Sequence, residues 1–309
     1  MKVSPHVFKT FPEFSKLTLA DRDRYQALIA GYPPFSEFSF PTLMTWWNTL
    51  NSCAISQLNG NLVISHWLPG DEAMSGLSMI GTDRVDESVC AIFDELKGHS
   101  EVARLVHVPE FVVSNMRFPE LYTFTAEREL DECVIPVSTL YSLGNMIKHR
   151  RWKVRRFLAE VEEDRVVLKS LDFQENQQEL LDIVAAWQQK GTLNNLGRFE
   201  REAIETAIIH GDALGLENAC VYIDGQMHSF LLYSLPSEAE YATIHYSRFS
   251  FAMPHIFEFV AYKYAHWFAD LGVKYVNIES DLGLPTLRAA KLALGPSNFF
   301  RKYTIKPAL

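Results

Sequence analysis

Two segments of the chain, one in each half, show the same alternation of apolar and polar residues on both sides of a short turn. The turns are Asn59-Gly60 and Asp224-Gly225, and the flanking segments are 52–57 and 62–67, then 219–223 and 227–233. Asn-Gly and Asp-Gly pairs tolerate the positive φ angles of a type I′ turn. The pattern therefore predicts a β-hairpin in each half of the chain.

The elements around the two hairpins also follow one order. Two helical segments precede each hairpin, and a strand, a helix and a short apolar strand follow it. The segments are 21–30, 42–50, 77–80, 85–96 and 105–108, then 177–189, 200–209, 241–246, 254–268 and 275–278. This order resembles that of the GNAT acyltransferase fold. We predict an α/β (α+β) protein with two tandem GNAT-like domains, each a mixed, mostly antiparallel sheet flanked by helices. An unrelated α+β arrangement is the alternative.

We place the boundary between the two domains near residues 136–139. Residues 131–137 have the apolar pattern of a strand that can close the first sheet. Ser138 or Thr139 then offers an N-cap for a helix that runs to about residue 161. The predicted domains are 1–137, a degenerate unit, and 138–309, which contains the candidate active site.

Composition narrows the functional classes. The 309 residues are 48% hydrophobic, as in an ordinary globular protein, and their formal charge of −9 argues against a nucleic-acid binder that uses its whole surface. No segment resembles a signal peptide or approaches the ~18 apolar residues of a membrane span. We expect a cytoplasmic protein without an integral membrane segment, with four free, buried cysteines. The histidine spacing predicts no metal site, and the sequence does not determine the oligomeric state.

Six basic residues and no acidic one lie between positions 148 and 156 of this acidic chain. On a helix, guanidinium groups at one-turn spacing match phosphate oxygens, and Trp152 among them could stack on a base. We interpret four of the six as phosphate-binding candidates: Lys148, Arg150, Arg151 and Arg155. The alternative is a solvated helix whose charge is balanced by acidic residues downstream, such as Glu160.

A second polar cluster lies where a buried strand runs into a turn and a helix, over residues 277–292. The carboxyl ends of such strands are where open α/β sheets bind ligands. Glu279 and Asp281 are two residues apart, so in an extended strand both would point to the same side and could accept a proton from an attacking amine or hydroxyl. Arg288 and Lys291 on the following helix could hold an anionic group. The alternative is that Asp281 or Ser280 caps the helix while Arg288 pairs with a nearby carboxylate.

These segments resemble motifs of the DUF2156 family, which is related to the C-terminal catalytic domain of phosphatidylglycerol lysyltransferases. The family pattern G-K-K-x-x-K-K-R-N-x-x-x-K-F is matched in part by residues 144–157. The pattern N-R-E-x-D-L-G-x-x-G-L-R-x-A-K is matched at Asn277, Glu279, Asp281, Leu282, Gly283, Leu287, Arg288, Ala290 and Lys291. The segment Phe300-Arg301-Lys302-Tyr303 resembles the closing K-Y of the family.

The resemblance implies two GNAT-like halves and the transfer of an acyl or aminoacyl group. In the lysyltransferase relatives the donor is a charged tRNA and the acceptor is a lipid headgroup. It also implies that Asn277 belongs to the substrate site and that Lys302 and Tyr303 close it. Trp152 stands where the family has Asn and Ile278 where it has Arg. The absence of membrane segments weakens the case for a lipid acceptor, and the expected acceptor is a small molecule or a lipid headgroup.

Other residues bear on the donor and the acceptor. GNAT enzymes bind the CoA pyrophosphate on backbone N–H groups of a glycine-rich loop, but residues 247–254 contain no glycine and 80–84 contain one. CoA is therefore the less favoured donor, although Arg248 could supply charge. His245, on a predicted central strand, is a candidate catalytic base, with a core histidine as the alternative. Asn194 lies between two predicted helices, where such folds often receive an acceptor.

Together these features predict an acyltransferase that moves an aminoacyl group from a charged tRNA to an unidentified amine or hydroxyl acceptor. Glu279 would be the general base or would orient the amine, and Asp281 would be its partner. The basic helix and the acidic strand end would share one crevice. There are two alternatives: an acyl-CoA-dependent N-acyltransferase, and a non-catalytic module that binds anions or nucleic acid on the same scaffold.

Overall fold

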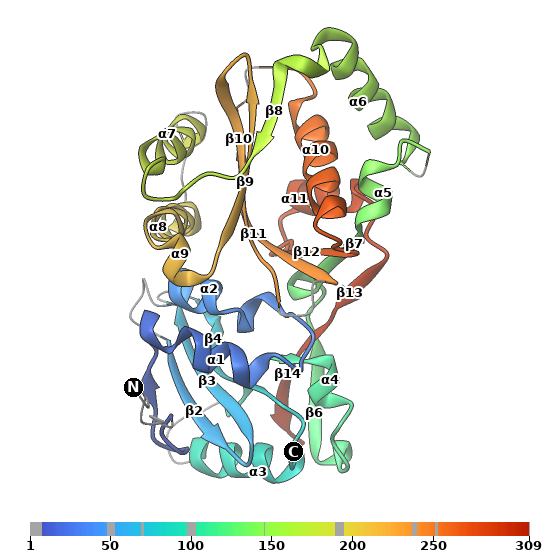
Figure 1. Cartoon of the computed structure of the whole chain (residues 1–309). Coiled ribbons are helices and arrows are strands. Elements are labelled where there is room, and N and C mark those ends of the chain that lie inside the picture. Colours follow the sequence, from blue (N-terminus) through green and yellow to red (C-terminus); the bar gives the residue numbers. More distant parts are fainter. Residues whose placement is uncertain are drawn as a thin grey trace. The chain divides into compact units, whose positions relative to one another are not determined.

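The computed structural model describes residues 8–47, 53–68, 71–97, 103–144, 146–188, 195–236, 240–250 and 253–308. The chain divides into two compact units, Met1–Asp131 with Phe300–Leu309 and Glu132–Phe299. Each unit contains, within the described residues, one seven-stranded sheet with helices packed against it (Figure 1). The protein is therefore a mixed α/β structure built on two mixed sheets.

The first sheet has the strand order β1-β2-β3-β4-β5-β14-β6. Its strands are β1 (Ser15–Lys16), β2 (Ala54–Leu58), β3 (Asn61–Leu68), β4 (Asp71–Ile80), β5 (Leu105–Pro109), β6 (Tyr122–Ala126) and β14 (Lys302–Pro307). Strands β4 and β5 are parallel, and the other neighbours are antiparallel. The α-helices of this unit are, in the described residues, α1 (Arg22–Ile29), α2 (Phe40–Thr42), α3 (Val85–Leu96) and α4 (Glu110–Val113).

The second sheet has the order β13-β7-β12-β11-β10-β9-β8. Its strands are β7 (Glu132–Pro136), β8 (Val166–Lys169), β9 (Glu217–Ile223), β10 (Gln226–Ser234), β11 (Tyr241–Phe249), β12 (Tyr275–Ser280) and β13 (Asn298–Phe300). Strands β11 and β12 are parallel, whereas β8 to β11 form an antiparallel series and β7 is antiparallel to β12. The helices of this unit include α5 (Val137–Tyr141), α6 (Lys148–Glu160), α7 (Gln177–Gln188), α8 (Asn195–Ile209), α9 (Gly211–Leu214), α10 (Ile256–Asp270) and α11 (Pro285–Ala293).

Both predicted hairpins are confirmed. Strands β2 and β3 are joined by Asn59 and Gly60, whose φ angles are 53° and 91°. Strands β9 and β10 are joined by Asp224 and Gly225, with φ angles of 54° and 79°. Positive φ at both central residues is what a type I′ turn requires, so the local sequence accounts for both turns.

The strands that complete the sheets differ from the prediction. We expected residues 131–137 to close the first sheet and the second domain to continue to residue 309. Instead β7 lies beside β12 in the second sheet, and β14 lies between β5 and β6 in the first. The reason is that the pattern of a short strand is the same in either sheet. Its sequence predicts a strand but does not identify the partner.

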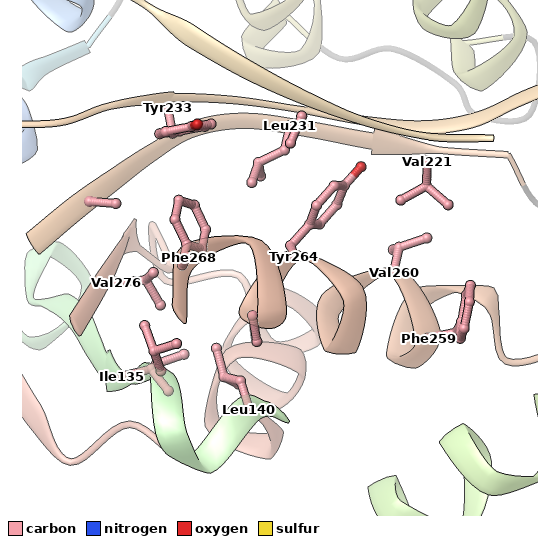
Figure 2. Packing of buried hydrophobic residues seen from close by; sticks show 14 of the residues in the cluster. Ile135, Leu140, Val221, Leu231, Tyr233, Phe259, Val260, Tyr264, Phe268 and Val276 are labelled. Carbon is pink, nitrogen blue, oxygen red and sulfur yellow. The ribbon is translucent and has the colours of Figure 1, made fainter. Parts of the chain in front are cut away.

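Helix α10 covers one face of the second sheet and supplies much of its core. Figure 2 shows Leu231, Tyr233 and Val276 of the strands facing Tyr264 and Phe268 of the helix, all of them buried. The Tyr264 hydroxyl donates to Ser229 Oγ at 2.7 Å, and Trp267 Nε1 donates to the Tyr233 hydroxyl at 2.8 Å. Helix α7 contacts β10 and β11 from the other side of the sheet (Figure 1).

The four cysteines were expected to be free and buried. All four are free, and Cys53, Cys133 and Cys220 are buried, but Cys90 is exposed. Cys90 lies on α3, an amphipathic helix that buries Val89 and Ile92 and leaves its opposite side in solvent.

Within the described ranges, no helix has the length and apolar character that crossing a bilayer requires.

Candidate active site

The parallel strands β11 and β12 are paired only as far as Thr243 and Asn277. Just beyond this pair, β11 contains a β-bulge against β10. Leu232 and Tyr233 are consecutive on β10, but they face Tyr246 and Ile244 of β11. His245, between these two β11 residues, is therefore the extra residue of the bulge. A bulge bends its strand and redirects a side chain, and bulges are frequent next to active sites. His245 is therefore placed by an irregularity at the carboxyl end of the parallel pair, where open α/β sheets bind ligands.

Strand β12 contains a second bulge at the same level of the sheet. Asn277 and Ser280 face β7 residues that are only two positions apart, which leaves one extra residue on β12. Glu279, in this bulge, has a φ of 60°. The alternation of an extended strand is broken there, so the expectation that Glu279 and Asp281 point to one side as a catalytic pair is wrong.

His245 joins Glu279 to a third residue, Ser234, at the end of β10. Its Nδ1 lies 3.3 Å from Glu279 Oε1, and its Nε2 lies 2.9 Å from Ser234 Oγ. The His245 side chain is 2% exposed, whereas that of Glu279 is 25% exposed. The arrangement thus contains a shielded imidazole between a partly exposed hydroxyl and a partly exposed carboxylate.

Asn277 holds the bulge that positions Glu279. Its Nδ2 donates to the Glu132 carboxylate, and its Oδ1 accepts from the backbone N–H of Glu279 at 2.9 Å. Asn277 and Glu132 are both wholly buried. We expected Asn277 to bind substrate; the structure instead makes it a positioning residue, because its amide is used inside the protein.

Asp281 and Arg288 form an ion pair of two hydrogen bonds. Arg288 Nε and Nη2 donate to the two Asp281 carboxylate oxygens at 2.9 Å each, and the backbone N–H of Gly283 donates to Asp281 Oδ1 at 3.0 Å. Asp281 is fully buried, so it fixes the turn between β12 and α11 and cannot meet a substrate. The predicted alternative is confirmed for Arg288, which pairs with a nearby carboxylate, but not for the cap, because the N-cap of α11 is Leu284 and not Asp281 or Ser280.

Lys291 binds the backbone of β12. Its ammonium donates to the carbonyl oxygens of Ile278 and Ser280, the second at 2.6 Å. Burial lowers the pKa of Lys291, while the nearby Glu279 carboxylate partly offsets this effect. The carbonyls beside the bulge are thereby satisfied, so the structure does not support Lys291 as an anion clamp.

This site geometry can be compared with known proteins. The family model described as "Phosphatidylglycerol lysyltransferase, C-terminal" matches residues 35–306. The chain belongs to this family. The prediction of a DUF2156-type protein is therefore confirmed. A search of curated proteins found no match.

Solved structures show the same fold. A conserved protein of unknown function from Bacteroides thetaiotaomicron has a TM-score of 0.79 and 22% identity over 96% of this chain and 99% of its own. The C-terminal domain (DUF2156) of an Agrobacterium fabrum protein described as a lysylphosphatidylglycerol synthetase has a TM-score of 0.63 and 15% identity, over 94% and 93%. L-PGS from Bacillus licheniformis has a TM-score of 0.58 and 14% identity, over 93% and 92%.

The basic segment of this lysyltransferase-family chain is helical, but the single helix predicted from Ser138 or Thr139 to about residue 161 is interrupted: α5 ends at Tyr141 and α6 begins at Lys148. Most cations of α6 are used within the protein. Arg150 is buried, donates to the Leu140 carbonyl oxygen at 3.4 Å, and burial lowers its pKa to about 10. Arg151 Nη1 donates to the Leu143 carbonyl oxygen at 3.1 Å. The phosphate-binding assignment of Arg150 is therefore wrong, because its guanidinium is buried inside the protein.

The remaining cations of α6 divide into two groups. Lys153 pairs with Glu258 of α10 at 2.5 Å, and Arg156 pairs with Glu160 at 2.7 Å. Lys148 and Arg155 are exposed and make, among the described residues, no ion pair. Between them Trp152 is 54% exposed, with the ring of His149 6.5 Å from its own. The exposed part of α6 is thus an aromatic ring with two available cations.

The expected crevice between α6 and the acidic strand end is not formed by direct contacts. Helix α6 packs on α10, with the rings of Phe157 and Phe259 4.1 Å apart. None of the hydrogen bonds or ion pairs of the described α6 residues reaches β11 or β12. Tyr233 points into the α10 core, so alternation along β10 directs Ser234 to the other face of the sheet. Helix α6 lies on the α10 side of the second sheet (Figure 1). The basic helix and the Ser234 side chain therefore belong to different faces of this sheet.

Three other candidates, Arg248, Lys302 and Tyr303, lie apart from the His245 site or have other roles. Arg248 pairs with Glu200 of α8 at 2.7 Å and lies 4.2 Å over the Trp187 ring, so its charge is already used. Asn194 lies outside the described residues. Lys302 and Tyr303, expected to close the site, belong to β14 of the first unit. Lys302 is buried there and pairs with the Glu37 carboxylate.

The first unit carries a related arrangement on the corresponding strands. Strand β5, the parallel partner of β4, has a bulge against β14, and His107 in that bulge has a φ of 54°. His66 Nε2 lies 2.6 Å from Ser78 Oγ, and the rings of His66 and His107 are 5.8 Å apart. All three residues are buried, with at most 2% exposed, so no substrate reaches them. This histidine pair thus occupies, in a closed form, the position of the His245 site.

The buried histidine pair predicts a dependence of stability on pH. Burial, and to a lesser degree the nearby His107, lower the pKa of His66 well below its usual range. The unfolded chain takes up a proton near pH 6.5 that the folded chain rejects, so stability falls as the pH drops below about 6.5, by up to about 1.4 kcal/mol per pH unit. His66→Gln should flatten this slope in denaturant titrations between pH 7 and 5. The exposed His210→Gln variant should keep it, and equal slopes for both variants would refute the assignment.

Sequence reasoning found His245 and Glu279 but missed Ser234. The apolar pattern of the hairpin predicted a strand ending at residue 233, which placed Ser234 in the following loop. In the structure Ser234 is the last residue of β10 and faces Thr243 of β11. A polar residue directly after the apolar run 230–233 was the available signal.

Proposed function

We propose that this protein transfers an aminoacyl group from a charged tRNA to an amine or hydroxyl acceptor. The observation that carries the proposal is the pairing of His245 with Glu279 at two bulges beyond a parallel strand pair. An amine or hydroxyl that attacks an aminoacyl ester must lose a proton, and an imidazole oriented by a carboxylate is suited to accept it. Membership of a lysyltransferase family supports this reaction class.

The strand arrangement supports a GNAT-type scaffold in both units. Each sheet contains a parallel pair, β4–β5 or β11–β12, whose outer neighbours are antiparallel to it. The second unit has the partly exposed Glu279, whereas the corresponding position of the first is a buried histidine. We infer that the second unit is catalytic and the first is a degenerate copy.

The exposed part of α6 is our candidate for contact with the tRNA. Lys148 and Arg155 can each neutralise a phosphate, and Trp152 can stack on a base or cover a ribose. Because α6 and the Ser234 side chain belong to different faces of the sheet, this contact would be made with a part of the tRNA remote from the reacting ester. A tRNA is long enough to reach both.

The tRNA proposal predicts a charge-dependent affinity. The double variant Lys148→Glu/Arg155→Glu should lower the affinity for charged tRNA at least about tenfold in filter binding. It should also reduce the slope of log K against log salt by about 1 for each phosphate that the helix no longer neutralises. Arg201→Glu, on the exposed side of α8, is a charge reversal away from α6 and serves as the control. If the double variant and the control bind equally well, α6 does not bind the tRNA.

A further inference from the structure

Three neighbouring strands place a serine, a histidine and a carboxylate in a series across the second sheet. Ser234 of β10 faces Thr243 of β11, and Thr243 faces Asn277 of β12. His245 and Glu279 each lie two positions further along their strands. The register of the sheet therefore brings the three side chains together, and both contacts are within hydrogen-bonding reach, at 2.9 Å and 3.3 Å.

The contacts of the imidazole define the direction of proton movement. An ionised carboxylate only accepts hydrogen bonds, so His245 Nδ1 carries the proton that faces Glu279. In the neutral ring Nε2 then has a free electron pair, and the Ser234 hydroxyl donates to it. This is the order nucleophile, base and orienting acid that activates a serine hydroxyl.

Exposure matches these roles. The imidazole is shielded from solvent, while Ser234, at the strand end, is only partly buried. The same unit contains a second serine–histidine pair, Ser250 Oγ and His228 Nδ1, 2.8 Å apart. Among the described residues, no carboxylate makes a hydrogen bond to the His228 ring. The Ser250 pair therefore lacks the orienting acid and provides an internal comparison.

We propose that Ser234 is a catalytic nucleophile that carries the aminoacyl group as a covalent ester; this rests on the function proposed above. Ser234 Oγ attacks the ester carbonyl of the charged tRNA while His245 Nε2 takes the hydroxyl proton. The bond between the carbonyl carbon and the tRNA 3′ or 2′ oxygen breaks, and that oxygen leaves with the proton from His245. The acceptor amine or hydroxyl then attacks the seryl ester and gives its proton to His245, which returns it to Ser234 Oγ as the product forms.

The intermediate can be trapped by omitting the acceptor. Wild-type protein is mixed with a charged tRNA pool, quenched in acid and digested, and the peptide containing Ser234 is examined by mass spectrometry. We expect this peptide to gain the mass of one aminoacyl group. The adduct should fall at least about 100-fold in Ser234→Ala and His245→Gln and remain in Ser250→Ala. The proposal is overturned if Ser234 carries no adduct and Ser234→Ala transfers the aminoacyl group, or deacylates the tRNA, at an undiminished rate. That result would not contradict the proposed transferase function.

A second probe separates the two proposals when charged tRNA is not a substrate. A fluorophosphonate reacts with activated serine hydroxyls and needs no knowledge of the donor. We expect it to modify Ser234 in the wild type but neither Ser234 in His245→Gln nor Ser250 in any variant. Modification of Ser234 without any reaction of charged tRNA would refute the tRNA donor and retain the nucleophile. If charged tRNA does not react and the fluorophosphonate does not modify Ser234, both the tRNA donor and the Ser234 nucleophile are refuted.

Discussion

Replacing Glu279 with Gln is expected to lower the rate of aminoacyl transfer by about 10²–10⁴-fold. The amide can still accept a hydrogen bond from His245 Nδ1, but it lacks the negative charge that stabilises the imidazolium formed when His245 takes a proton. The loss should fall on the rate constant of the chemical step, while tRNA affinity stays within about twofold. Single-turnover assays with charged tRNA measure the two quantities separately.

The control for this experiment is another carboxylate of the same unit. Glu240→Gln removes an exposed charge that pairs with Lys274 at 2.5 Å, so it should leave the transfer rate unchanged. A thermal unfolding curve for each variant shows whether the fold is intact. If Glu279→Gln retains the wild-type rate, the His245–Glu279 pair does not take part in the proton transfer. The proposed function would then lose its main support.

Replacing Lys302 with Met is expected to destabilise the first unit by about 3–5 kcal/mol. The Lys302 side chain is wholly shielded from solvent and its ammonium pairs with the Glu37 carboxylate, which is itself 12% exposed. Removing the cation leaves a buried carboxylate without this counter-ion, and its desolvation cost then opposes folding. We expect the midpoint of thermal unfolding to fall on the order of 10 °C.

Two further variants test the cause of that loss. Lys306→Met removes an exposed lysine from the same strand and should change the stability by less than about 0.5 kcal/mol. Glu37→Met combined with Lys302→Met removes both charges and should recover part of the stability. If Lys302→Met is no more destabilising than Lys306→Met, the buried pair contributes nothing to the fold.

The elements of both units could be predicted because their signals are local. The Asn-Gly and Asp-Gly turns and the apolar alternation of the flanking strands are properties of short segments, and they predicted both hairpins correctly. The choice of partner for β7 and β14 depends instead on residues more than a hundred positions away, which short-range periodicity does not encode.

The candidate site was predicted only in part, for a similar reason. The residues 279 and 281 follow the rule of alternation only while the strand stays extended, and the bulge at Glu279 cancels it. The bulge is stabilised by Asn277 and Glu132, which the chain brings together from distant positions. In the basic segment, the sequence predicted helical structure, but it did not predict that the Arg150 side chain would be buried.

The position of β14 has a consequence for synthesis of the protein on the ribosome. The other strands of the first sheet emerge before about residue 127, but β14 begins at Lys302, about 170 residues later. At the usual 5–20 residues per second, roughly 10–35 s pass between these events. During that interval β5 and β6 lack the strand that separates them, so their exposed edges are open to a chaperone or to a neighbouring nascent chain.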